Sequence, residues 1–185
     1  GKQTRLGAAE GVVERMGLGI AALGRGNTGS ADPQTSPGAY WNPAFLALRW
    51  RTLDFSAGGE RRSLDRYGYA LGIEGGVGQR AGVGAAIGVR MDGNFPVINE
   101  DDVLLGHAMP SLGSAWVGVG WRLSRMDAVG FSMAISWMDL DVARYYSDID
   151  MVDEQQGNSS MTLGYYRALS NRWNLGVVVR NVGFN

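Results

Sequence analysis

The stretch Gly82-Val83-Gly84-Ala85-Ala86-Ile87-Gly88-Val89-Arg90-Met91 decides the fold class. Larger apolar side chains alternate in it with glycine, alanine and arginine. This period of two is typical of a β-strand, in which successive side chains point to opposite faces of the sheet. Six other runs after residue 51 show the same alternation. The expected strands lie at residues 52–57, 67–74, 82–91, 115–123, 129–138, 161–166 and 173–180. The sequence therefore predicts an all-β protein with about seven strands.

The two faces of these expected strands differ in composition. One face carries large apolar residues, and the other carries mostly glycine, alanine and serine. A solvated face would carry polar residues, so the small residues suit the closely filled interior of a barrel. Charged residues facing lipid cost a few kcal/mol near the bilayer midplane. We therefore expect the five charges on the small-residue face to line a lumen, as a polar lining, as contacts to a plug or as structural salt bridges. They are Asp54, Glu74, Arg90, Arg122 and Arg180.

The connections between the strands alternate in length. Residues 75–80, 124–127 and 169–172 form short turns, whereas residues 92–112 and 139–158 form long polar loops. This alternation predicts an antiparallel up-and-down β-barrel that crosses a membrane, with periplasmic turns and loops on the cell surface. We expect residues 92–112 to form no strand, because Pro96 and Pro110 resist strand continuation. Outward aromatic residues would then form two membrane girdles. They are Trp121 and Trp173 at the turn ends, and Tyr67 and Trp137 at the loop ends.

The bulk composition agrees with one domain of 185 residues. The formal net charge is −1, so no basic surface argues for nucleic acid. The absence of cysteine excludes disulfides and thiolate metal sites. Glycine supplies 29 residues, about twice the average share. A mean hydropathy of −0.11 fits a soluble protein, and it also fits a transmembrane barrel because only alternate residues meet lipid.

Residues 1–50 show no sustained alternation and are punctuated by Pro33, Pro37 and Pro43. A short helix is expected from Pro43 to about Arg49, with Asn42 as the N-cap and Pro43 at the first helical position. The start of the chain has charge but no following apolar core of a signal peptide, so we take it as a processed or trimmed start. We expect residues 1–50 to form a hatch or plug and residues 51–185 to form the barrel strands.

Three motifs suggest chemistry but have simpler interpretations. Gly24-x-Gly26-x-x-Gly29 matches a dinucleotide fingerprint, yet no βαβ unit follows it, so we interpret it as a tight irregular segment. His107 lies in a polar loop without a nearby catalytic triad pattern. An acidic cluster could hold calcium, although a solvated loop is the preferred interpretation. Its members are Asp148, Asp150, Asp153 and Glu154. We expect no catalytic residue, no metal site and no cofactor.

A glycine-rich segment at residues 23–29 and the box Tyr40-Trp41-Asn42-Pro43-Ala44 precede the first expected strand. This order resembles the N-terminus of bacterial outer-membrane β-barrels of the FadL and PorV/PorQ type. In the FadL family an Asn-Pro-Ala segment belongs to a hatch folded into the lumen, and Asn42, Pro43 and Ala44 match it. That family continues with Gly-Leu-Ala, whereas this chain has Phe45-Leu46-Ala47. The segment at residues 180–184 also looks like a mid-barrel strand of PorV/PorQ-type proteins.

The resemblance implies a non-enzymatic protein in the bacterial outer membrane, in contact with its lipid. The PorV branch implies a component of type IX-like protein secretion or surface attachment, with exported proteins or secretion machinery as partners. The FadL branch implies uptake of hydrophobic compounds. A soluble β-sandwich binding module is a third possibility. Seven strands and the lack of a C-terminal aromatic residue suggest the N-terminal portion of a longer barrel.

Overall fold

A computed structural model of the chain describes residues 29–62, 65–99, 101–139, 141 and 155–183. Strands dominate these residues, and the only helices among them are three short ones near the start. The helices are η1 (Gly29–Ala31), α3 (Gly38–Trp41) and η2 (Pro43–Leu48). The strands are β1 (Leu53–Arg62), β2 (Arg66–Val77), β3 (Ala81–Met91), β4 (Phe95–Ile98), β5 (Leu104–Ala108), β6 (Ser111–Arg122), β7 (Asp127–Asp139), β8 (Gln155–Ala168) and β9 (Asn174–Gly183).

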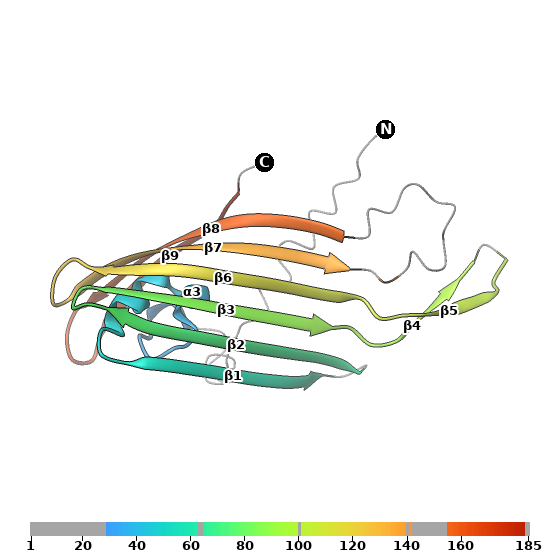
Figure 1. Ribbon diagram of the computed structural model, residues 1–185, viewed down its shortest axis with the longest axis horizontal. Coiled ribbons are helices and arrows are strands. Elements are labelled where there is room, and N and C mark those ends of the chain that lie inside the picture. Colours follow the sequence, from blue (N-terminus) through green and yellow to red (C-terminus); the bar gives the residue numbers. More distant parts are fainter. Residues whose placement is uncertain (1–28, 63–64, 100, 140, 142–154, 184–185) are drawn as a thin grey trace.

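Seven strands form one antiparallel sheet in the order β1-β2-β3-β6-β7-β8-β9 (Figure 1). Each strand pairs with its neighbours in register over most of its length. Trp121, for example, lies opposite Ala81 of β3 on one side and opposite Val129 of β7 on the other. The predictions of an all-β chain, of antiparallel pairing and of about seven strands are therefore confirmed.

Most strands are longer than their clear alternation in the sequence. β7 has 13 residues and β8 has 14. The added residues lie mainly at the loop ends, as in Ser111–Ser114 of β6, where small and polar residues hide the period of two. Backbone pairing with long neighbours extends these strands although their own side chains give little signal.

The expectation that residues 92–112 form no strand is wrong. β4 and β5 form a separate two-stranded hairpin, in which Pro96 lies opposite His107. Each strand of an isolated hairpin has one unpaired side, so a residue without an N–H can be accommodated there. Asn99 closes the turn, because its Oδ1 accepts from the backbone N–H of Asp101 and Val103. The hairpin projects beyond the end of the main sheet (Figure 1).

Residues 29–50, which precede β1, form what we call the inner segment. The helix expected from Pro43 is present as the 3-10 helix η2, which ends at Leu48. Pro43 begins it, and Asn42 Oδ1 accepts from the backbone N–H of Ala44 at 3.0 Å, as expected of an N-cap. The sequence did not predict η1 and α3. No helix among the described residues is long and apolar enough to cross a membrane.

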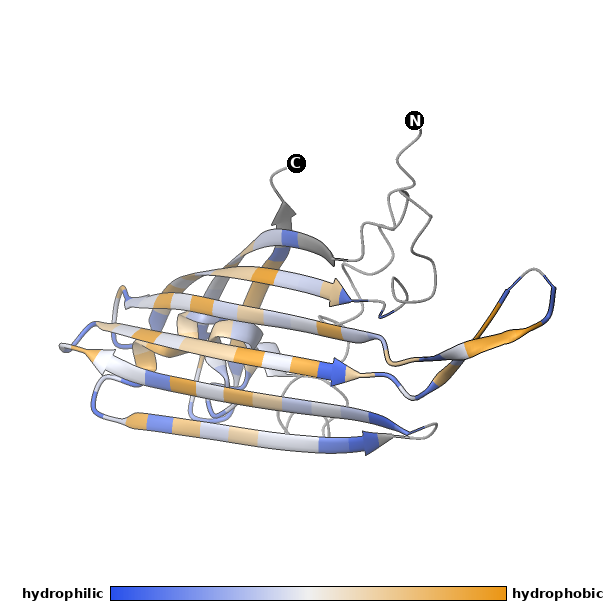
Figure 2. Cartoon of the chain, turned by 45° about the vertical axis from the view of Figure 1, so that its right-hand side comes forward, coloured by the Kyte–Doolittle hydropathy of each residue, from blue (hydrophilic) through white to orange (hydrophobic). Residues whose placement is uncertain are grey.

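The main sheet curves around the inner segment, which lies against its concave face (Figures 1 and 2). η2 contacts β2, β3, β6, β7 and β8, while α3 contacts β3, β6 and β7, and η1 contacts β9. The buried core therefore sits between this face and the inner segment. One cluster centres on Tyr40, Trp41 and Trp116, and a second on Ala44, Phe45 and Tyr166.

Candidate functional site

The convex face of the sheet exposes large apolar side chains. Phe55 is 73% exposed and Ile135 is 63% exposed. Orange bands run across the strands in Figure 2, where orange marks hydrophobic residues. Further exposed members on this face are Leu53, Tyr69, Leu71, Ile73, Val83, Ile87, Val117, Val119, Met133, Leu163, Leu175, Val177 and Val179. Among the described outward positions of the seven strands, charges occur only near strand ends. These charges are Arg61, Asp127, Asp139 and Arg167.

The concave face carries a row of glycines that lie opposite one another on five neighbouring strands. The row consists of Gly76, Gly82, Gly120, Gly130 and Gly164. We call it the glycine row. η2 packs on this row, because the glycines allow the backbone of the inner segment to approach the backbone of the sheet closely. A β-carbon added at Gly130 would lie 2.1 Å from the carbonyl carbon of Pro43, and one at Gly82 would lie 1.8 Å from the carbonyl oxygen of Leu46. Larger side chains in the row would lift η2 off the sheet.

The large residues on the concave face pack against the inner segment. The rings of Tyr40 and Trp116 meet edge to face, with centroids 5.1 Å apart. Phe45 and Tyr166 meet in the same way at 5.6 Å. Aromatic pairs of this geometry add stabilisation beyond their buried area. The glycine row and these aromatic residues together shape a surface that fits one segment.

All five residues of the hatch motif, Tyr40 to Ala44, are buried in this contact. Asn42 is fully buried and uses both ends of its side chain. Its Oδ1 caps η2, and its Nδ2 donates to the carbonyl oxygens of Ser30 at 2.9 Å and Tyr165 at 3.1 Å. A buried amide that makes these bonds avoids the cost of unsatisfied polar groups. Asn42 therefore connects η1, η2 and β8.

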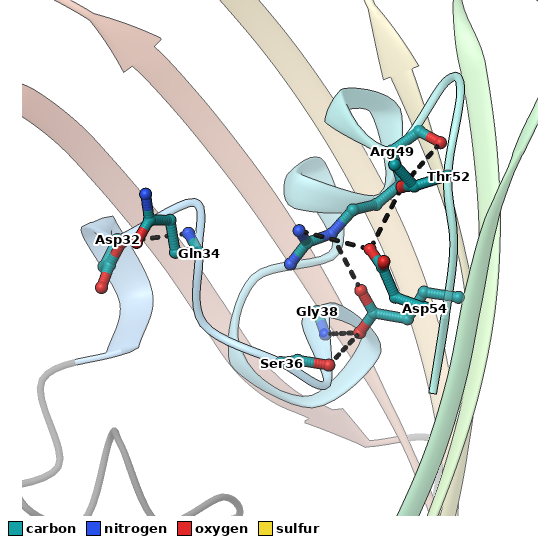
Figure 3. A network of polar contacts seen from close by, with 8 residues as sticks. Asp32, Gln34, Ser36, Gly38, Arg49, Thr52 and Asp54 are labelled. Carbon is teal, nitrogen blue, oxygen red and sulfur yellow. Dashed lines mark hydrogen bonds and ion pairs between the residues drawn. The ribbon is translucent and has the colours of Figure 1, made fainter. Parts of the chain in front are cut away.

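Glu74 joins the concave face to the inner segment through a buried carboxylate. Figure 3 shows Ser36, Gly38, Arg49 and Asp54, which belong to the same network. One oxygen of Glu74 accepts from the backbone N–H of Gly38 and from Ser36 Oγ, the latter at 3.3 Å. The other oxygen accepts from Arg49 Nε at 3.2 Å. Arg49 also pairs with Asp54 Oδ2 at 3.4 Å. These charge-assisted bonds connect α3, the end of η2 and the strands β1 and β2.

Arg180 and Arg122 donate hydrogen bonds to backbone carbonyl oxygens of the inner segment. Arg180 Nη2 donates to the carbonyl of Trp41 at 2.7 Å and to that of Tyr40 at 3.2 Å. Its guanidinium also lies 5.3 Å from the Tyr40 ring centroid. Arg122 Nη2 donates to the carbonyl of Ala47 at 3.2 Å. These carbonyls lie near the ends of α3 and η2, where intrahelical partners are missing.

Arg90 occupies a different place on the concave face. Its Nε lies 2.8 Å from Asp92 Oδ1, and Arg66 Nε lies 3.6 Å from the same oxygen. This group sits at the end of β3 where the long connection begins. Four of the five predicted luminal charges thus belong to the network around the inner segment, and Arg90 belongs to the rim. Whether this space is a lumen stays a prediction.

The predicted girdle residues lie on the convex side at both ends of the sheet. Trp121 and Trp173 lie at the end with the short turns, exposed by 51% and 73%. Tyr67 and Trp137 lie at the opposite end and are half-buried. Tyr165, which the sequence analysis did not single out, also lies at the turn end, and its hydroxyl donates to Asp127 Oδ1 at 2.7 Å. A role of these residues in lipid stays a prediction.

The other motifs do not join this site. His107 is exposed on β5. Gly29 begins η1, whereas Gly24, Gly26 and the acidic cluster at residues 148–154 lie outside the described residues. Within the part of the chain that the structure describes, no group of three or more histidine, cysteine or acidic residues is placed to hold a metal ion.

The arrangement as a whole holds one segment of the chain against a curved sheet through packing, hydrogen bonds and ion pairs. Arg49, the residue that connects Glu74 with Asp54, was missed by the sequence analysis. Its position directly after η2 was the available signal, because cations favour helix C-termini. Comparison of the chain with protein-family models, curated proteins and solved structures found no match.

Proposed function

We propose that the chain belongs to a transmembrane β-barrel of the bacterial outer membrane and that its inner segment is a hatch in the lumen. The observation that carries this proposal is the exposed apolar convex face, on which the charges of the described residues lie only at the borders. Soluble monomers rarely expose apolar patches above about 300–600 Å². An exposed apolar face of this kind is energetically favourable in contact with lipid.

The strand lengths support the same proposal. β3 has 11 residues, so it is about 36 Å long at about 3.3 Å per residue. A tilt of about 40°, as in barrels, reduces its height to about 28 Å. The hydrocarbon core of a bilayer is about 30 Å thick. The other strands of the main sheet have 10–14 residues and fit the same thickness.

Within this class we propose a non-enzymatic role in protein secretion or surface attachment, as in PorV/PorQ-like proteins. Glu74, Asn42 and Arg180 make hydrogen bonds that hold the inner segment in place. The hairpin β4–β5 exposes Ile98, Val103 and Leu104 beyond the sheet. An isolated hairpin is marginally stable in water, so a protein partner on these side chains would stabilise it.

A FadL-like role in the uptake of hydrophobic compounds is the second candidate. The observation that favours it is the position of Asn42, Pro43 and Ala44 on the concave face, where the FadL family has its hatch. Deletion of the gene separates the two roles. Loss of exported proteins from the cell surface supports secretion, whereas loss of growth on hydrophobic carbon sources with normal surface proteins supports uptake.

The barrel itself is tested by fractionation of cells that produce the full-length protein. We expect the protein in the outer-membrane fraction, released by detergent and resistant to high salt, and migrating differently on gels before and after heating. A tag inserted after Asn99 should be stained on intact cells. Recovery of the protein in the soluble fraction would support a β-sandwich module instead, and staining only after permeabilisation would invert the orientation.

A further inference from the structure

The two ends of the main sheet differ in their balance of charge, although the hairpin end also carries Arg61, Arg66 and Arg90, which pair with Asp65 and Asp92. The end with the short turns is rich in arginine, and the end with the hairpin is rich in acidic residues. The arginines at the turn end are Arg51, Arg80, Arg122, Arg125, Arg167 and Arg172. The acidic residues at the other end include Glu60, Asp65, Asp92, Asp101, Asp102 and Asp139. In Figure 2, hydrophilic colour marks the turns that join the strands at the first of these ends.

Three of the arginines lie in the turns themselves and are exposed. Arg80 joins β2 to β3, Arg125 joins β6 to β7, and Arg172 joins β8 to β9. We call them the turn arginines. Within the described residues none of the three forms an ion pair. Because successive turns are two strands apart, the arginines recur about every 10 Å along the border of the sheet.

The acidic residues at this end are already engaged. Asp127 accepts from Ser124 Oγ at 2.7 Å and from the Tyr165 hydroxyl at 2.7 Å, and Arg167 lies 3.7 Å from it. Asp54 pairs with Arg49 and accepts from Thr52 Oγ1. The positive charge of the turn arginines is therefore not cancelled by neighbouring carboxylates.

Exposed apolar side chains accompany the turn arginines. Trp121, Leu123 and Met126 lie beside Arg125, and Leu169 and Trp173 lie beside Arg172. A border in which tryptophan and aliphatic residues give way to arginine is typical of a membrane–water interface. The apolar residues set the depth of the protein in the bilayer, and the arginines then lie at the level of the headgroups.

We propose that the turn arginines bind the headgroups of anionic phospholipids, such as phosphatidylglycerol, in the leaflet on the turn side. This inference rests on the proposed function, because it needs the convex face to lie in lipid. A guanidinium group donates paired hydrogen bonds to a phosphate, and an anionic surface attracts each exposed arginine. At the opposite end Arg61, Arg66 and Arg90 pair with acidic residues, so the attraction there is weaker and the protein prefers one orientation relative to anionic lipid.

The test uses the full-length protein refolded into vesicles of phosphatidylcholine and phosphatidylglycerol in equal proportions. Either lipid carries a nitroxide quencher near the glycerol, and tryptophan fluorescence reports which lipid lies next to the protein. The chain has six tryptophans, and Trp41, Trp50 and Trp116 stay in every variant as a common background. Trp137→Phe leaves Trp121 and Trp173 as the exposed reporters at the turn end. The double variant Trp121→Phe/Trp173→Phe leaves Trp137 at the opposite end with the same background, so the difference between the two variants reports the two ends.

At the turn end we expect stronger quenching by phosphatidylglycerol than by phosphatidylcholine. The triple variant Arg80→Gln/Arg125→Gln/Arg172→Gln should lose this preference, by about two- to five-fold for each arginine removed. High salt should weaken it in the parent protein. Arg61→Gln, at the opposite end, is the matched control and should leave it unchanged.

A triple variant that keeps the preference of the parent protein would overturn the inference, and so would equal quenching by the two lipids at the turn end. Insertion is scored separately by migration on gels before and after heating. A protein that inserts without a lipid preference overturns this inference alone. A protein that inserts into neither kind of vesicle overturns the proposed function.

Discussion

The two faces of the main sheet are built from the same strands but have opposite surroundings. Gly120 on the concave face lies at backbone distance from the inner segment, whereas its neighbour Trp121 on the convex face is half exposed. The concave face is specified in detail, by glycines, aromatic pairs and buried charges. The convex face is specified only by being apolar. A face that binds one segment needs shape, whereas a face that meets a fluid solvent needs only the right polarity.

The largest effect that we expect comes from the buried carboxylate of the concave face. Glu74→Gln removes the charge that pairs with Arg49, and loss of one partner of a buried pair costs about 3–5 kcal/mol. Denaturant titration of the refolded protein measures the free energy of unfolding. Asp54→Asn is the matched control, because it removes the more exposed partner of the same arginine and should cost under about 1 kcal/mol. Equal losses would mean that burial does not distinguish the two carboxylates.

The next prediction tests the convex face. Val119→Arg should destabilise the protein in lipid vesicles by roughly 2–4 kcal/mol, since an arginine near the bilayer midplane is costly. Val119→Leu keeps the face apolar and should change little. If the convex face met water, an arginine at this exposed position would cost under about 0.5 kcal/mol. Such a small effect would contradict the proposed membrane contact.

A smaller effect is expected from the glycine row. Gly130→Ala places a β-carbon against the backbone of Pro43 and Ala44, and we expect a loss of about 1–3 kcal/mol from overpacking. Gly58→Ala is the control within a strand, because a β-carbon there meets nothing within 4 Å. That change should be neutral or stabilising by up to about 1 kcal/mol. Comparable stabilities for the two variants would show that close backbone packing of η2 on the glycine row does not contribute to stability.

The smallest predicted effect concerns a hydrogen bond at the turn end of the sheet. Tyr165→Phe removes the hydroxyl that donates to Asp127, and such a bond contributes about 1 kcal/mol. The ring remains, so insertion into vesicles should be unchanged while the unfolding midpoint falls slightly. A loss of insertion would show that the hydroxyl acts in lipid contact rather than in a local hydrogen bond.

Much of the main sheet could be predicted because one residue in two is large and apolar. The period of two located all seven strands, and the phase of Glu74 placed it on the small-residue face. The ends of β6 and β8 were not predicted, because their serine, glycine and glutamine residues show no alternation of large apolar and small side chains. The hairpin β4–β5 escaped because Pro96 and the acidic residues at its tip are typical of loops.

The candidate site could be predicted only in outline. A small-residue face indicates space for a segment, and the hatch motif indicated which segment fills it. The partners could not be assigned, since the contact between Glu74 and Gly38 joins residues 36 positions apart and depends on the curvature of the sheet. The local signals were clearer. Asn42 and Pro43 marked the start of η2 because capping is decided within a few residues.

The long-range anchoring of the inner segment has a consequence for the order of folding. Asn42 bonds to a strand 123 residues further along the chain, and Arg180 reaches Trp41 across 139 residues. Contacts across such long loops form late, because closing the loop costs entropy before the contact repays it. Residues 29–50 precede all nine described strands in the chain, and we expect them to dock after most of these strands have formed. Until β8 and β9 are in place, Tyr40, Trp41 and Phe45 are not fully buried. Their exposed apolar surface then favours aggregation.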